Sequence, residues 1–135
     1  MLKNSGDDHS LLGSLVVILV VFGGIVVHEL VHGLTWAYHA RQGWQSIRFG
    51  VFWKALAPYC HCEEPMLRNH HLKAILMPGL VLGVRPALIG LALGLPNWVL
   101  FGWFFTGAAG GDVIMAGMML KEPATVKLQD MDNAL

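Results

Sequence analysis

The chain has 135 residues, of which 55% are hydrophobic and only 13% are charged, and its formal net charge is zero. This length holds one domain of ordinary size, and the composition is typical of a protein embedded in lipid. A neutral chain whose few cations lie in connecting segments offers no basic face to a phosphate backbone. We therefore expect a membrane protein that contacts lipid and has no nucleic-acid partner.

Three apolar stretches predict the architecture. Residues 11–27 and 74–84 carry no charged side chain, and 98–113 contains only Asp112. About 20 apolar residues are needed for a helix to cross a hydrocarbon core of about 30 Å. We predict an all-α membrane protein in which a single domain, 11–120, holds three transmembrane helices at about 11–38, 72–95 and 98–120.

Both ends of the chain are polar, so 1–10 and 121–135 are predicted to be tails. Most cations lie between the first two spans or after the third, and only Lys3 precedes the first. They are Arg41, Arg48, Lys54, Arg68, Lys73, Lys121 and Lys127. The positive-inside rule then predicts a multi-pass protein of the cell membrane, with its long loop and C-terminus cytoplasmic and its N-terminus outside. The first and third helices are expected to run parallel.

The first span contains a motif with metal-binding chemistry, His28-Glu29-Leu30-Val31-His32. Histidines four apart on a helix project from one face, so one metal ion can bridge them, and Glu29 lies beside that face. This is the geometry of a metallopeptidase, in which the carboxylate takes a proton from a metal-bound water. The motif is short enough to arise by chance, but these side chains cost several kcal/mol in an apolar span unless they have partners. We predict one zinc ion per chain.

Residues 43–63 change to a period of two, with Ile47, Phe49 and Val51 alternating with more polar or smaller residues. This pattern predicts a short membrane-associated β-hairpin, and the alternative is an interfacial loop anchored by its aromatic side chains. In Cys60-His61-Cys62 the spacing on a strand points both thiols to one face and His61 to the other, which is not a usual zinc-finger arrangement.

The second span contains Pro78 and Pro86, which predict a kink or a break, with a re-entrant pair of short helices as an alternative. His70 and His71 begin this span and are interpreted as polar anchors at the interface. Arg85 also lies within it. This arginine has three open roles: an ion pair with Asp112, snorkelling to the interface, or stabilisation of an oxyanion near the metal.

A metal site in lipid needs a third protein ligand, and Asp112 is the candidate. His32 precedes Arg41 by about nine residues, and Asp112 precedes Lys121 by about nine, so parallel helices place both at similar depth. Small residues just before them, Gly23 and Gly24 in one span and 107–111 in the other, are expected to let the helices approach closely.

These motifs resemble those of the site-2 protease type of intramembrane zinc metallopeptidase, and specifically its small zincin peptidase relatives. The resemblance covers most of the chain and rests on His28-Glu29-Leu30-Val31-His32-Gly33, on Tyr59-Cys60-His61-Cys62-Glu63-Glu64-Pro65 with Pro78, and on Gly110-Gly111-Asp112.

The resemblance implies that His28, His32 and Asp112 hold catalytic zinc, that Glu29 is the general base, and that the hairpin presents substrate as an added strand. Site-2 proteases carry their third ligand in an Asn-Pro-Asp-Gly or Leu-Asp-Gly type of motif. Here Val113 follows the aspartate instead, and we expect no attached substrate-selecting module.

The leading interpretation is a zinc-dependent intramembrane endopeptidase that hydrolyses membrane-embedded or membrane-proximal bonds in a peptide or transmembrane protein. A non-catalytic membrane protein that binds metal or haem for sensing or transport is the main alternative, motivated by four histidines, His28, His32, His70 and His71. An inactive protease relative that binds transmembrane partners is a further one.

Overall fold

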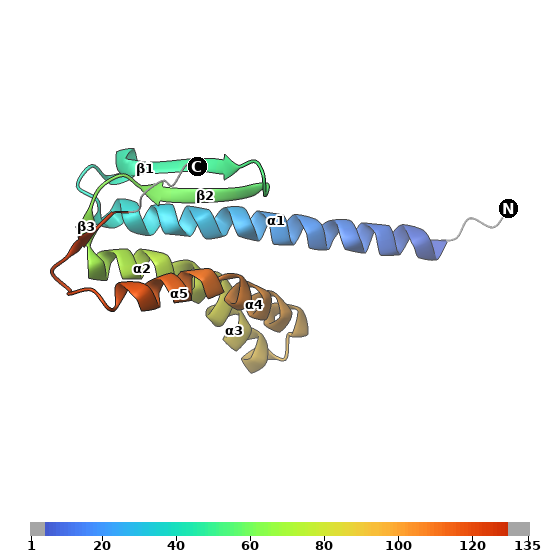
Figure 1. Ribbon diagram of the computed structural model, residues 1–135. Helices are drawn as coiled ribbons and strands as arrows, with labels where there is room; N and C mark the ends of the chain where they lie inside the picture. Colours follow the sequence, from blue (N-terminus) through green and yellow to red (C-terminus); the bar gives the residue numbers. More distant parts are fainter. Residues whose placement is uncertain (1–4, 130–135) are drawn as a thin grey trace.

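The computed structural model describes residues 5–129, and helices dominate it (Figure 1). Its longest element is α1 (Ser5–His39), a continuous helix of 35 residues. At about 1.5 Å per residue it is about 50 Å long, which exceeds the thickness of a bilayer's hydrocarbon core. The apolar side chains from Leu11 to Val20 are exposed to the surroundings, as expected for a lipid-facing helix. Of the predicted N-terminal tail, residues from Ser5 onward belong to α1, and residues 1–4 lie outside the described part.

The segment after α1 forms the predicted hairpin. A 3₁₀ turn, η1 (Gly43–Ser46), leads into β1 (Ile47–Phe52), which pairs antiparallel with β2 (Ala57–Cys62). The hairpin lies along the C-terminal half of α1 (Figure 1). Gly33 makes this possible, because a Cβ there would come within 2.7 Å of the Phe49 ring.

The second span is one helix of 26 residues, Arg68–Leu93, whose winding changes along its length. It consists of α2 (Arg68–Pro78), a π-helical segment η2 (Gly79–Val84) and α3 (Arg85–Leu93). The sequence predicts a kink or a break at the two prolines. The helix does not break at either proline, and its winding changes to the π form directly after Pro78.

The third apolar stretch is divided into α4 (Pro96–Ala108) and α5 (Gly110–Met119), bent by 44° at their junction. Two helices, His9–His39 and Arg68–Leu93, are thus long and apolar enough to cross a membrane, and the bent pair makes a third if it counts as one span. The sequence did not predict this bend. The α4–α5 pair runs in the same direction as α1, as expected (Figure 1).

Part of the predicted C-terminal tail takes part in the fold. Lys127–Leu128 form β4, which pairs antiparallel with β3 (Met66–Leu67) just before α2. This short pairing ties the chain beyond α5 back to the start of the second span. Residues 130–135 lie outside the described part.

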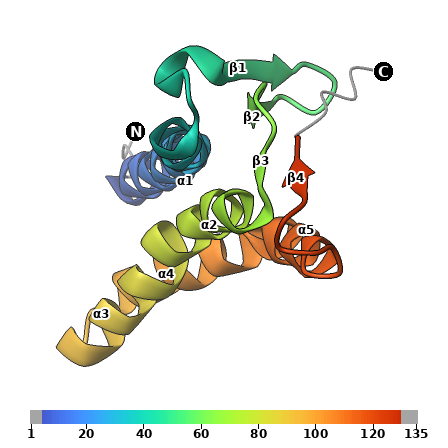
Figure 2. The ribbon, with the colours of Figure 1, turned by 90° about the vertical axis from the view of Figure 1, so that its left-hand side faces the viewer.

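The core lies where the end of α1 meets the hairpin on one side and α2 and α5 on the other (Figure 2). Its buried residues are Trp36, Ile47, Cys60, Cys62, Met66, Ala74, Ile75 and Ala116. Both cysteines face this core, whereas His61 is less buried and stacks on Tyr59, as the strand periodicity predicts. This core fixes α2 against the face of α1 that carries the histidines, and α5 packs in turn against α2.

The expectation about small residues was only partly correct. Gly24 lies against the Phe105 ring so closely that a Cβ at this position would overlap the ring. Gly23 and, in the third span, Gly107, Gly110 and Gly111 would place a Cβ in open space, with no neighbour within 4 Å. The second span and α4 approach each other instead at three other glycines, Gly83, Gly90 and Gly102, where a Cβ would collide with backbone atoms of the facing helix.

Candidate metal centre

The two histidines of the motif lie on one face of α1 and are buried in the protein. His28 is 9% exposed and His32 is 6% exposed, although much of the helix surface before them is open. Their ring centroids are 4.9 Å apart with the planes nearly perpendicular. The spacing of four residues therefore produces a pair of imidazoles that converge on one point, as the sequence predicts.

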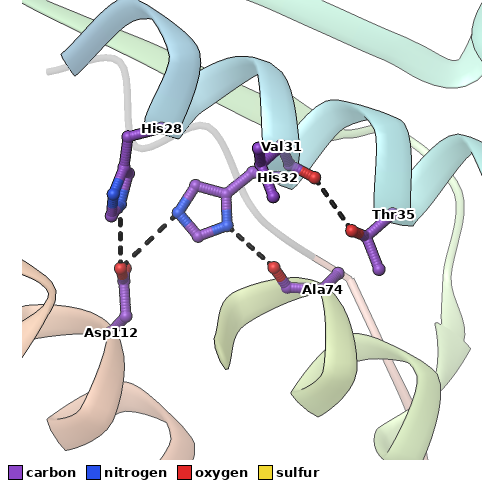
Figure 3. Close-up of polar contacts among 6 residues, drawn as sticks. All are labelled: His28, Val31, His32, Thr35, Ala74 and Asp112. Atoms are coloured by element: carbon purple, nitrogen blue, oxygen red, sulfur yellow. Dashed lines mark hydrogen bonds and ion pairs between the residues drawn. The ribbon is translucent and has the colours of Figure 1, made fainter. Parts of the chain in front are cut away.

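Asp112, in the first turn of α5, faces this pair across the helix interface (Figure 3). Its Oδ2 atom lies 3.0 Å from Nε2 of His28 and 3.6 Å from Nε2 of His32. The three atoms thus come from two helices separated by about eighty residues of sequence. Asp112 lies just after the bend between α4 and α5.

His32 is held by a second contact. Its Nδ1 atom lies 2.9 Å from the backbone carbonyl oxygen of Ala74 in α2 (Figure 3). A carbonyl can only accept, so Nδ1 carries the proton and Nε2 is left to face Asp112. Metal-binding histidines are commonly oriented in this way by a carbonyl or carboxylate on their other nitrogen.

Trp36 extends the same face of α1 by one more turn, and the sequence interpretation missed it. Its ring stacks on that of His32, with centroids 5.4 Å apart and an angle of 23°, and it is 3% exposed. On its far side lies His71, also 5.4 Å away. The signal was the i, i+4, i+8 series His28, His32 and Trp36, which places all three side chains on one stripe of a helix.

Glu29 lies one position round the helix and faces the hairpin. Its carboxylate and one nitrogen from each of His28 and His32 lie within 4.8 Å of one another. Two cavities, of about 430 and 340 Å³, meet at this residue. Both are bordered by Glu29 and Pro58, and most of their other lining side chains are apolar: Val26, Leu30, Phe49, Val51 and Tyr59 in the first, and Phe22, Ile25, Leu56 and Phe105 in the second.

The remaining polar candidates lie elsewhere. Arg85 is exposed and forms no ion pair with Asp112, whose described ion-pair contacts are with the two histidines. His71, interpreted from sequence as an interfacial anchor, is 1% exposed and belongs to the interior, which corrects that interpretation. Within residues 5–129, Cys60, His61 and Cys62 do not join a group of three or more metal-binding side chains.

The donor set suits zinc. Four ligands about 2.0–2.1 Å from a tetrahedral ion lie about 3.3 Å from one another. The separations of 3.0 and 3.6 Å from Asp112 to the two histidines bracket that value. With Asp112 as third ligand, the set would comprise two imidazole nitrogens and one carboxylate oxygen, which are donors that zinc accepts, and it would leave a fourth position open.

A family comparison agrees with this geometry. Residues 21–127 match the model of a family described as "Putative zincin peptidase", so the chain belongs to that family. The match covers α1 from before the histidines, the hairpin, the second span and the α4–α5 pair with Asp112. No match was found among curated proteins or among solved structures. Family membership points to a zinc metallopeptidase, and the His-Glu-His group is compatible with that assignment.

Proposed function

We propose that this chain is a zinc-dependent intramembrane endopeptidase that hydrolyses membrane-embedded or membrane-proximal peptide bonds. The observation that carries the proposal is the convergence of His28, His32 and Asp112 from two apolar helices, with Glu29 beside them. A buried cluster of this kind is costly in lipid unless its members bind something together.

In this proposal His28, His32 and Asp112 hold one zinc ion. When bound, zinc would polarise the scissile carbonyl and lower the pKa of a coordinated water toward about 7. Glu29 accepts the proton of the attacking water and then delivers it to the leaving amine nitrogen. Its carboxylate suits this role because it lies close to the two histidines and is not one of the three proposed ligands. Asp112 is left ionised as a ligand.

The substrate is proposed to be an extended segment that passes between α1 and the hairpin. The two cavities flank Glu29 and are lined mostly by apolar side chains, which suits apolar residues on both sides of the scissile bond. The exposed edges of the hairpin offer backbone groups to which such a segment can add as a strand. Membrane-spanning substrates would have to unwind locally to reach this site.

Kinship with site-2 proteases is part of the proposal. It rests on the motif within the first span, a third ligand in the third span and the hairpin between the first two. In this proposal α4 and α5 together form the third span, and the excess of Lys and Arg supports a cytoplasmic location for the hairpin and the C-terminus.

The test is a comparison of Glu29→Gln with wild type in proteoliposomes containing membrane proteins of the host. New N-termini are identified by chemical labelling and mass spectrometry. The matched control is Glu63→Gln, which removes an exposed carboxylate outside the site. We expect the same cleavages with wild type and Glu63→Gln, and a loss of about 10²–10⁴-fold with Glu29→Gln. Cleavage that persists in Glu29→Gln would overturn the assignment of the base.

A further inference from the structure

The carbonyl oxygen that orients His32 lies in a helix, where carbonyls are normally occupied. Ala74 is in the middle of α2, and an α-helical carbonyl accepts the N–H of the residue four positions later. For Ala74 that residue is Pro78, which has no N–H. The carbonyl that receives the Nδ1–H of His32 at 2.9 Å is thus the one whose regular helical donor is missing.

The chain around Pro78 keeps this carbonyl available. A proline ring also clashes with the carbonyl four residues earlier and turns it outward from the helix axis. The following amide, that of Gly79, donates to Leu76, and the winding then changes to the π form. Pro78 is itself fully buried, as is Ala74, so the carbonyl is not open to the surrounding solvent.

The consequence reaches the metal ligand. With Nδ1 donating to Ala74, the neutral ring of His32 has its lone pair on Nε2, the atom 3.6 Å from Asp112. An alanine at position 78 would supply an N–H that competes for the same carbonyl. His32 would then lose its fixed partner, and the tautomer with the proton on Nε2, which cannot bind a metal through that atom, would become populated.

We propose that Pro78 is a positioning residue for His32: by leaving the Ala74 carbonyl without its helical donor, it sets the tautomer and direction of the imidazole. The predicted effect on zinc affinity rests on the proposed zinc site. The predicted effect on the His32 tautomer does not, because it depends only on residues of this chain. The two parts are therefore separable in experiment.

The experiment uses full-length protein in micelles with ¹⁵N-labelled histidine. The His32 signals are assigned from their loss in His32→Gln. Spectra of the metal-free protein are recorded at alkaline pH, where the imidazole is neutral, so that Nδ1–H and Nε2–H forms are distinguished by nitrogen chemical shift. Zinc affinity is measured on the same samples by competition with a chromophoric chelator.

Three variants separate the missing N–H from the shape of proline. Pro78→Ala restores the N–H. An ester-linked lactic acid residue at position 78 has the side chain of alanine but again lacks the N–H. Pro86→Ala is the matched control, because this proline lies in the same 26-residue helix but borders a different cavity, with Val20 and Trp98.

We expect wild type, the ester variant and Pro86→Ala to hold His32 in the Nδ1–H form with unchanged zinc affinity. Pro78→Ala should show mixed tautomers and bind zinc about 10- to 100-fold more weakly, the usual effect of losing such an outer partner. A wild-type tautomer in Pro78→Ala would overturn the proposal. An ester variant that behaves like Pro78→Ala would overturn it too, since the ring and not the absent N–H would then be responsible. A tautomer change without zinc binding in any sample would keep the role of Pro78 and refute the zinc site.

Discussion

Asp112 and the two histidines interact across an interface that depends on individual side chains. Gly24, one turn before His28, is a position of close contact between α1 and α4, because the ring of the buried Phe105 occupies the space of its missing side chain. Phe105 precedes Asp112 by seven residues, so this contact helps to set the position along α1 at which α5 begins.

Gly24→Ala should therefore destabilise the protein by about 1–3 kcal/mol, the usual cost of overpacking. Gly23→Ala is the control, since a Cβ there meets nothing within 4 Å, and it should leave stability unchanged or slightly higher. Thermal unfolding in detergent, followed by circular dichroism, measures both. Equal melting temperatures for the two variants would show that Phe105 does not pack on α1 as described.

At the level of elements, the hairpin and α1 form the walls of the two cavities beside Glu29. Gly33 lies directly after the motif, and a Cβ at this position would lie 2.7–3.2 Å from side-chain atoms of Phe49, Cys60 and Ile47 in the hairpin. The hairpin thus lies close to α1 only because residue 33 has no side chain.

Gly33→Val should push the hairpin away from α1 while leaving the metal ligands in place. We expect zinc content to stay near wild type and any peptidase activity to fall by at least tenfold, because the walls beside Glu29 move apart. Elemental analysis and the cleavage assay measure the two effects separately. Full activity in Gly33→Val would argue that substrate does not use the space under the hairpin.

Glu64 joins the end of the hairpin to the turn after α1. Its carboxylate accepts hydrogen bonds from the Ser46 hydroxyl and from the backbone N–H groups of Gln42, at 2.9 Å, and Arg41, at 3.0 Å. These bonds, that from Ser46 foremost, lower the pKa of Glu64 below its ordinary value of 4.5. Because the folded-state pKa is the lower one, the contribution to stability is complete above about pH 4.5 and is lost as the pH falls through the folded-state pKa.

The amide proton of Gln42 should report this titration. We expect the chemical shift of this amide proton to change with a midpoint below pH 4.5 in wild type. In Glu64→Gln no such step is expected, because the side-chain carboxamide at position 64 cannot ionise. Two-dimensional NMR in micelles at a series of pH values makes the measurement. A midpoint at or above this ordinary value would mean that the carboxylate does not receive these hydrogen bonds.

Part of this architecture follows from sequence because its signals are local. The i, i+4 spacing of His28 and His32 fixes a shared helix face, and the period-two alternation around Phe49 identifies a strand. The bend at Ala109 and the identity of the close helix contacts depend on which helices meet, and that is a long-range property. The presence of a glycine in the sequence does not tell whether a neighbouring helix packs there: Gly24 is packed against Phe105, whereas Gly111 faces open space.

On the scale of the whole molecule, a bound metal would join α1 to α5, two elements that otherwise make few contacts around the site. Removing zinc should therefore lower the melting temperature of wild type. The loss corresponds to about 2.7 kcal/mol when free zinc had been about 100 times its Kd. A chelator should not affect Asp112→Ala, in which that link is already absent. A wild-type protein that melts at the same temperature with and without chelator would argue against the link.

The most direct test of the central claim is zinc per chain, by elemental analysis of detergent-purified wild type, His28→Ala, Glu29→Gln and Asp112→Ala. About one zinc in wild type and in Glu29→Gln, with loss in the other two, is the result expected for a three-ligand site with a separate base. Zinc retained in Asp112→Ala would remove that aspartate from the ligand set, and no zinc in wild type would contradict the metal centre itself.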